Sequence, residues 1–341
     1  MHTSQLLMRL GASILCAAGI ANANYVLADK YNHTNFFDEF SFFSGSDPTN
    51  GFVEFSSASV ANTSGLAGYS NGAVYLGVDS TTVNPSGGRG AVRLTSNKAY
   101  THGLFIADIT HMPGGICGVW PAFWTFGPNW PASGEIDIIE GVNTQATNAI
   151  TLHTSAGCTM SGIGSLNGSV LQNSNCNAGN GNTGCSTRTT STLGYGAGFN
   201  ANGGGVYAME WTSSAIKVYF FPRNAIPSDI TYGSPNPSGW GIPVASLSGS
   251  GCDIDSQFMN HNIIFDTTFC GDWAGQVWSS GQCASLASTC DAYVAANPSA
   301  FTQAYWLINS VTVYSGNATV YSGNATKRTK RDAVKPVPFR A

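Results

Sequence analysis

The chain has 341 residues, of which 43% are hydrophobic, only 9% are charged and 41 are glycine. Its 14 Lys and Arg and 18 Asp and Glu give a formal charge of −4, and residues 24–326 alone contain 7 basic and 17 acidic side chains. This acidic balance argues against a nucleic-acid partner, whose phosphates require Lys and Arg, and an uncharged ligand such as a polysaccharide fits better.

The first 23 residues have the pattern of a secretory signal peptide. Arg9 precedes an apolar run from Leu10 to Ile20, and residues 21–23 provide small side chains for cleavage. No later stretch approaches the roughly 20 apolar residues of a membrane-spanning helix. We therefore expect a secreted, extracellular protein without a membrane span, and we expect it to be a monomer.

Short β-strands are predicted along most of residues 24–326. Some alternate between apolar and polar residues, and others are continuously apolar. This mixture is typical of a two-sheet sandwich in which each sheet has one buried and one wetter face, so we expect one large all-β domain. Examples of the predicted strands span 72–78, 90–95, 104–109, 134–139, 149–153, 205–211, 215–221, 261–266 and 305–314.

Several tryptophans are candidates for contact with a sugar. Sugar rings stack their C–H faces on flat indoles, and an exposed Trp usually binds something. Trp124 and Trp130 lie shortly before an acidic motif, and Trp273 lies in a later loop, so we expect these three to contact substrate. Trp211 and Trp306 lie in alternating strands and are expected in the core.

Residues 134–141, GEIDIIEG, place three carboxylates in an otherwise apolar, β-branched stretch. Buried acids are costly unless they are paired or functional. Glu135, Asp137 and Glu140 are therefore candidate catalytic residues; an acidic strand paired with Lys or Arg is the structural alternative.

The spacing of the three acids predicts a β-bulge. Side chains alternate across a strand, so Glu135 and Asp137 share a face and Glu140 should point the other way. One extra residue at about Ile138 to Ile139 would restore the phase. Retaining glycoside hydrolysis needs two carboxyl groups roughly 5 to 5.5 Å apart, one as nucleophile and one as acid/base. An ionised Asp137 between them would help to keep one glutamate protonated.

Three polar residues are further candidates for sugar binding. His153 ends the strand that should pair with the acidic strand, and Asn143 follows Glu140 closely. Arg93 could hydrogen-bond sugar hydroxyls or balance an acid. For each, a structural role in a strand, loop or turn is the alternative.

Eight cysteines follow the signal peptide, and an even number suits four disulfides in an oxidising compartment. The short spacings favour pairing of Cys176 with Cys185 and of Cys283 with Cys290. The sequence has no CxxC motif, and its histidines do not cluster with the cysteines, so no metal site is predicted.

Three segments interrupt the strand pattern. Residues 156–204 are rich in Gly, Asn, Ser and Thr and are expected to form loops stapled by disulfides. Residues 282–300 are expected to form a short helix that ends near Pro298. The basic residues 327–341 are expected to be a disordered tail, either merely solvated or carrying a dibasic processing site.

Asn-X-Ser/Thr sequons mark candidate glycosylation sites, and hence surface positions. They are Asn32, Asn62, Asn167, Asn317 and Asn324. The last two belong to a tandem copy of VYSGNAT at 313–319 and 320–326.

With these motifs, the chain resembles glycoside hydrolase family 16, and in particular the fungal secreted laminarinase-like endo-β-1,3(4)-glucanases. The resemblance is carried by FFDEFSFFSGSDPTNGFVEF, by HGLFIADITHMPGGICGVWPAFWTFGPNWPASGEIDIIEGVN, and by FCGDWAG and CASLASTC. It implies a concanavalin A-like β-jelly-roll sandwich with an open substrate cleft on its concave face, and hydrolysis with retention. The tandem VYSGNAT and the basic tail depart from the family pattern.

By position, the resemblance implies that Glu135 is the nucleophile, Glu140 the acid/base and Asp137 the carboxylate that assists them. It also implies a β-glucan substrate and no cofactor. Two alternatives remain open. A transglycosylase would use the same acids and pass the sugar to another sugar, and a non-catalytic β-glucan-binding protein would keep the fold but need not keep the acids.

Overall fold

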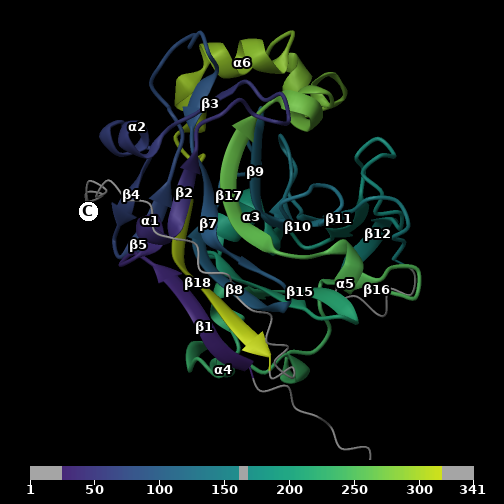
Figure 1. Cartoon of the computed structure of the whole chain (residues 1–341). Coiled ribbons are helices and arrows are strands. Elements are labelled where there is room, and N and C mark those ends of the chain that lie inside the picture. Colours follow the sequence, from purple (N-terminus) through teal and green to yellow (C-terminus); the bar gives the residue numbers. More distant parts are fainter. Residues whose placement is uncertain (1–24, 161–167, 317–341) are drawn as a thin grey trace, which may run out of the picture.

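The computed structural model describes residues 25–160 and 168–316, and its main feature is a pair of packed antiparallel β-sheets (Figure 1). The predicted signal peptide at 1–23, the sequons at Asn167, Asn317 and Asn324, and the predicted tail at 327–341 lie outside the described residues. Within the described part of the chain, no helix is long and apolar enough to cross a membrane.

The first sheet contains eight strands: β1 (Tyr25–Asn32), β4 (Ala67–Ser70), β5 (Ala73–Leu76), β8 (Gly103–His111), β14 (Gly205–Trp211), β15 (Ala215–Pro222), β16 (Ala245–Ser248) and β18 (Trp306–Gly316). Their order is β16-β15-β14-β8-β18-β5-β4, with β1 pairing with β18 outside this path.

The second sheet also has eight strands: β2 (Phe40–Phe43), β7 (Arg93–Tyr100), β9 (Val119–Phe126), β10 (Glu135–Glu140), β11 (Ala149–His153), β12 (Ser169–Asn173), β13 (Cys185–Thr189) and β17 (His261–Phe269). Their order is β12-β13-β11-β10-β9-β17-β7-β2. A separate parallel pair joins β3 (Val53–Phe55) to β6 (Arg89–Ala91).

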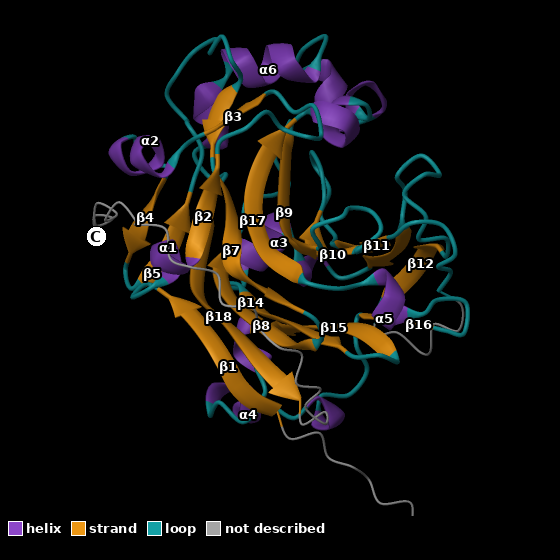
Figure 2. Ribbon diagram, in the orientation of Figure 1, coloured by secondary structure: helices purple, strands orange, loops and turns teal. Residues whose placement is uncertain are grey.

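The helices are short and lie around the two sheets (Figure 2). The α-helices are α1 (Phe36–Glu39), α2 (Ala58–Thr63), α3 (Gly196–Ala201), α4 (Ser228–Thr231), α5 (Ile254–Gln257) and α6 (Cys290–Ala296). Single 3-10 turns are η1 (Thr192–Gly194), η2 (Arg223–Ala225), η3 (Pro237–Gly239), η5 (Trp278–Ser280), η6 (Gln282–Ser285) and η7 (Pro298–Phe301), and η4 (Gly271–Gly275) is a π turn.

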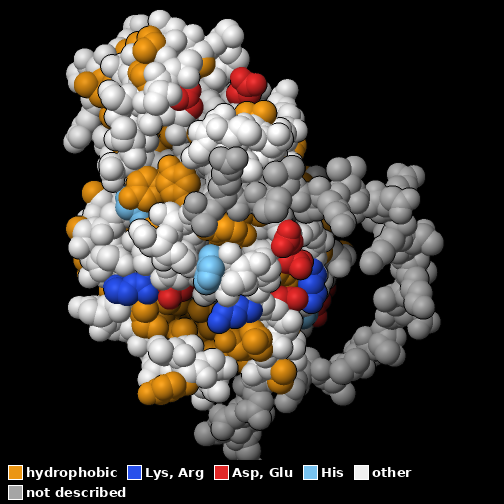
Figure 3. All heavy atoms as spheres, turned by 90° about the vertical axis from the view of Figure 1, so that its left-hand side faces the viewer, with side chains coloured by type: hydrophobic (Ala, Val, Ile, Leu, Met, Phe, Trp, Pro, Cys, Tyr) orange, Lys and Arg blue, Asp and Glu red, His pale blue; other side chains and the backbone are white. Residues whose placement is uncertain are grey.

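The core lies between the two sheets and is formed by every second residue of their strands. Phe123 and Ile136 of the second sheet belong to the same buried cluster as Met209 of the first. Trp211 and Trp306, each 1% exposed, also belong to it, which confirms their predicted core positions. The sandwich confirms the predicted all-β jelly roll. Charged side chains are few and scattered on the face shown in Figure 3, in line with their low share of the sequence.

Two predictions about irregular segments are wrong in part. Residues 156–204 are not loops throughout, because they include β12 and β13. Local composition disfavours these strands, but β13 pairs with the buried strand β11, and this tertiary contact decides the outcome. The predicted helix at 282–300 is shorter, since α6 covers only Cys290–Ala296 and ends before Pro298.

The disulfides confirm one predicted pair and correct the other. Cys176 is bonded to Cys185 as predicted, but Cys283 and Cys290 are not bonded to each other. Each instead ties the segment around α6 to a different part of the sandwich, which sequence spacing could not show. The four pairs are Cys117–Cys283, Cys158–Cys252, Cys176–Cys185 and Cys270–Cys290.

Candidate active site

Strand β10 contains the predicted β-bulge. Its pairing with β11 shifts register between Asp137 and Glu140, and its pairing with β9 shifts between Asp137 and Ile139. The extra residue brings Glu135, Asp137 and Glu140 onto one face of the second sheet, and Ile136 and Ile139 point into the core. We call this the acid face. It is the face of the second sheet turned away from the first sheet.

A buried asparagine holds the bulge in place. Asn148 Oδ1 accepts a hydrogen bond from the backbone N–H of Glu140 at 2.9 Å, and its Nδ2 donates to the carbonyl of Ile138 at 2.8 Å. A bulge leaves backbone groups without ladder partners, and a buried unpaired group is costly. Asn148 therefore supplies the partners that the interrupted ladder lacks. Sequence reasoning missed it, because it reads as an ordinary polar loop residue.

The three acids are packed together in a buried environment. Burial, together with the charge of Asp137, raises the pKa of Glu135 to about 8 and that of Glu140 to about 8. Burial also raises the pKa of Asp137 well above its usual value. Because neighbouring negative charges repel, the cluster keeps protons near neutral pH, and ionisation of one acid disfavours ionisation of the next. Such a cluster can offer one ionised and one protonated carboxyl group.

Trp120 contacts the acids directly, and sequence reasoning missed this contact too. Its Nε1 donates a hydrogen bond to Glu140 Oε1 at 2.8 Å, and this bond lowers the pKa of Glu140 against the effect of burial. Trp120 and Trp124 share a face of β9, so the alternation of the strand was a signal that could have identified it.

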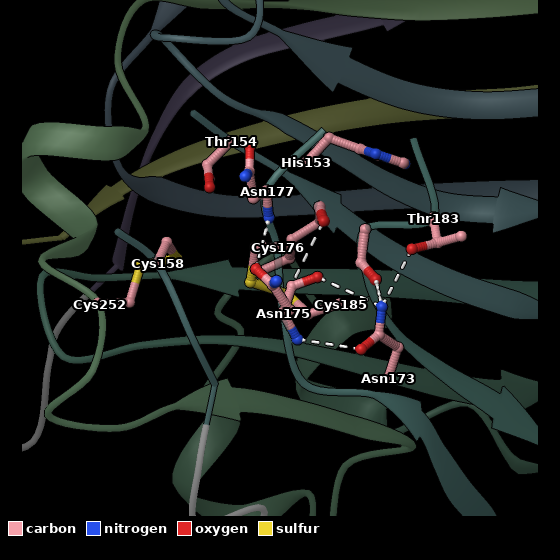
Figure 4. Close-up of a disulfide and its surroundings, with 12 residues drawn as sticks. His153, Thr154, Cys158, Asn173, Asn175, Cys176, Asn177, Thr183, Cys185 and Cys252 are labelled. Atoms are coloured by element: carbon pink, nitrogen blue, oxygen red, sulfur yellow. Dashed lines mark hydrogen bonds between the residues drawn. A yellow bond between two sulfur atoms is a disulfide. The ribbon is translucent and has the colours of Figure 1, made fainter. Parts of the chain in front are cut away.

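His153 lies beside two of the acids, opposite Glu135 in the register of β10 and β11. Its Nε2 is 3.4 Å from Asp137 Oδ2 and 3.9 Å from Glu135 Oε1. Figure 4 shows it at the end of β11, above the Cys176–Cys185 disulfide. Gly184, at a positive φ of 58°, packs so closely that an added Cβ would lie 2.9 Å from the imidazole. The loop closed by the Cys176–Cys185 disulfide therefore packs against the imidazole and restricts its position.

Arg93 and Trp124 pack together on the acid face. The guanidinium of Arg93 lies 4.8 Å from the centre of the Trp124 ring and 5.0 Å from that of Phe43, and Arg93 is only 8% exposed. The neighbouring carboxylate is Asp266, which accepts a hydrogen bond from Trp124 Nε1 at 3.2 Å. This geometry supports the alternative in which Arg93 balances an acid, here Asp266. The indole of Trp124 is partly exposed.

Trp130 and Trp273 lie near the two glutamates. Trp130 is 44% exposed, and its hydrogen bonding to Glu135 lowers the pKa of that acid against the effect of burial. Trp273, in η4, meets Trp120 edge to face at 5.6 Å. Trp130 therefore lies near Glu135. Trp273 contacts Trp120, which in turn contacts Glu140.

Asn143 has a structural role, which supports the turn alternative to a sugar contact. It adopts a left-handed turn conformation with φ of 53°. Its Oδ1 accepts a hydrogen bond from Gly118 N at 2.8 Å, and its Nδ2 donates to Ala274 O at 2.9 Å. The buried amide ties two loops together, so its polar atoms are already used by the backbone.

In the described ranges, two groups of side chains bring three possible metal ligands together. One contains Cys270 and Cys290, which are bonded to each other as a disulfide and are therefore unsuited to an ion. The other consists of Glu135, Asp137 and His153, whose ligand atoms all lie within 4.8 Å of one another. An ion there would occupy the carboxyl groups themselves.

Comparisons with known proteins agree on one family. A family model for the XgeA-like catalytic GH16 domain matches residues 40–314. An endo-1,3(4)-β-glucanase of Arthroderma benhamiae is 47% identical over 320 residues, which are 92% of this chain and 69% of that protein. A probable endo-1,3(4)-β-glucanase of Aspergillus fumigatus is 45% identical over 329 residues, and the match covers 92% of this chain and 50% of the relative. The chain thus spans about half the length of the Aspergillus protein.

Solved structures are similar over most of the described residues. Laminarinase 16A from Phanerochaete chrysosporium, solved with 6-O-glucosyl-laminaritriose in donor and acceptor sites, is 46% identical with a TM-score of 0.82. The match covers 86% of this chain and 100% of that one. An elongating GH family 16 β-1,3-glucosyltransferase is 46% identical with a TM-score of 0.81, over 85% of this chain and 100% of its own.

Proposed function

The chain belongs to glycoside hydrolase family 16, in the group of XgeA-like catalytic domains, and from this we propose that it is an endo-acting, retaining β-glucanase. Its substrates would be β-1,3 and mixed β-1,3/1,4 glucans. The observation that carries the proposal is the bulged strand β10, which turns Glu135, Asp137 and Glu140 to the same face.

The proposed reaction is a double displacement. Glu135 attacks the anomeric carbon while Glu140 protonates the leaving glycosidic oxygen, so a glycosyl ester forms on Glu135 as the glycosidic bond breaks. Glu140, now ionised, takes a proton from water, and the water oxygen displaces Glu135 from the anomeric carbon. The raised pKa of Glu140 favours its protonated form at the start of the cycle. The negative charge of Asp137 favours protonated glutamates and His153 opposes this effect, so the two residues act on the protonation of Glu135 and Glu140 in opposite directions.

The substrate would lie along the acid face, in the cleft that the family resemblance implies. We assign sugar contacts to Trp124, Trp130 and Trp273, because their partly exposed indoles lie next to the acids. His153, beside the reacting carboxylates, completes the proposed set, and Arg93 packs against Trp124 and balances the charge of Asp266. No cofactor takes part in this mechanism.

The similar glucosyltransferase makes transglycosylation the second candidate function. Both reactions share the glycosyl ester on Glu135 and differ only in whether water or another sugar accepts it. Incubation with a defined laminari-oligosaccharide separates them. Shorter products alone support hydrolysis, and the accumulation of products longer than the donor supports transfer.

We further propose that the protein is secreted and acts as a monomer. The signal pattern at residues 1–23 and the four disulfides support secretion, since disulfides persist in oxidising compartments. Residues 24–326 would form the catalytic domain and 327–341 a tail. Asn32 and Asn62 are proposed glycosylation sites on the surface, because neither is buried.

The test is digestion of laminarin, lichenan and carboxymethylcellulose side by side, with identification of the products. We expect rapid release of oligosaccharides from laminarin, cleavage of lichenan, and none from carboxymethylcellulose. The Glu135→Ala variant serves as the control for contaminating activity. Cleavage confined to carboxymethylcellulose would overturn the proposed substrate class.

A further inference from the structure

A fourth carboxylate lies on the acid face outside the GEIDIIEG motif. Asp266, on β17, is 7% exposed. It pairs with Ala122 of β9, which in turn pairs with Glu140 of β10, so Asp266 and Glu140 occupy the same row of the sheet. Only the methyl group of Ala122 stands between them in this row.

Asp266 is surrounded by groups from several elements. Trp124 of β9 donates its indole N–H to Asp266 Oδ1 at 3.2 Å, and Arg93 of β7 is its register partner. The pKa of Asp266 is raised to about 7. Burial is the largest cause of the rise, Arg93 opposes it, and the charge of Asp47, in the segment between β2 and β3, contributes to it. Across β9, the charge of Asp266 in turn raises the pKa values of Asp137 and Glu140.

Trp124 makes a hydrogen bond through the N–H of its indole and packing contacts through the ring face. Asp266 holds the N–H edge of the indole, the guanidinium of Arg93 lies over the ring at 4.8 Å, and Phe126 stacks with it at 5.1 Å. Arg93 and Phe126 contact the indole through its ring plane. The hydrogen bond to Asp266 fixes which edge points inward, because a directional bond weakens steeply when it is misaligned.

We propose that Asp266 is a positioning residue that locks Trp124, and through it the sugar-binding surface beside the reacting acids, in one orientation. The proposal rests on the proposed glucanase function. Asp266 exchanges no proton or bond with the substrate in this scheme. Its effect is on how well the substrate is held, so it should appear in KM more than in kcat.

The test compares Asp266→Ala, Asp266→Asn, Trp124→Phe and the double variant Asp266→Ala/Trp124→Phe on laminarin. We expect Asp266→Ala to raise KM about tenfold with kcat within about threefold, the size of a lost hydrogen bond to a charged group. Asp266→Asn keeps an acceptor oxygen and should recover most of the loss. Trp124→Phe lacks the N–H, so Asp266→Ala in that background should add little further.

A matched control is present elsewhere in the fold. Asp229 accepts a hydrogen bond from Trp240 Nε1 at 2.8 Å, and Trp240 packs against Tyr219 and Phe221, which belong to the first sheet. Asp229→Ala removes an aspartate–indole bond of the same kind and should leave KM unchanged.

Unchanged KM in Asp266→Ala, or equal losses from Asp266→Ala with and without the Trp124 N–H, would overturn the proposal. If thermal unfolding shows that Asp266→Ala is not folded, the KM of Trp124→Phe tests the proposal. A KM equal to that of the wild type would refute the proposed positioning role of Asp266. Absence of cleavage by the wild type would instead refute the proposed glucanase function.

Discussion

Substitution of Trp120 by Phe isolates one hydrogen bond at the proposed acid/base. The indole N–H donates to Glu140 Oε1 at 2.8 Å, whereas Phe keeps an aromatic ring without a donor. The bond favours the ionised carboxylate, so its loss should raise the pKa of Glu140 above about 8. A hydrogen bond to a charged group contributes about 1.5–3 kcal/mol, and one pKa unit corresponds to about 1.36 kcal/mol. Because Glu140 is partly exposed, we take the lower end and expect a rise of about one unit.

The assay is the pH dependence of kcat/KM on laminarin. Glu140 must be protonated to act as the acid, so the alkaline limb of the profile reports its ionisation and should move up by about one unit in Trp120→Phe. Trp240→Phe is the matched control, because its indole also donates to a carboxylate at 2.8 Å but lies against the first sheet. An alkaline limb that stays in place, or moves to lower pH, in a folded Trp120→Phe protein would refute the reasoning.

Three further predictions concern the two glutamates. Glu135→Ala should abolish cleavage while the protein stays folded, as circular dichroism and thermal unfolding can check; normal activity would end the nucleophile assignment. Glu140→Ala should lose activity on laminarin but retain its first step on aryl β-glucosides whose leaving group needs no protonation, and a burst of released phenol measures this. Because folding raises the pKa of both glutamates from 4.5 to about 8, the unfolded chain loses protons first as pH rises. Stability, measured as the melting temperature, should therefore fall between about pH 4.5 and 8. Glu135→Gln should reduce this decline. The same decline with pH in the variant and the wild type would count against the raised pKa values.

Short runs rich in apolar residues were enough to predict much of the sandwich. The predicted strand at 149–153 and the one at 205–211 coincide with β11 and β14, which are buried along nearly their whole length. Strands β12 and β13 were missed, since their polar residues resemble a loop until β11 is present to pair with.

In the candidate site, too, features set by one strand's own residues could be predicted, and features set by contacts between distant residues could not. The bulge followed from parity alone, because three acids within one strand have a fixed phase. Asn148 and Asp266 act through contacts with residues on other strands, and their residue types carry no local signal, whereas Trp120 shares the face of Trp124 and could have been identified from alternation. The pairing of Cys283 with Cys117, 166 positions away, could not be read from spacing for the same reason.

The most direct test of the double displacement is the anomeric configuration of the first products. Proton NMR during early digestion of laminarin records the new reducing ends before they mutarotate. Two displacements through Glu135 predict that the β-anomer appears first and the α-anomer only later, by mutarotation. Initial formation of the α-anomer would show a single displacement and would contradict the assignment of Glu135 and Glu140 as nucleophile and acid/base.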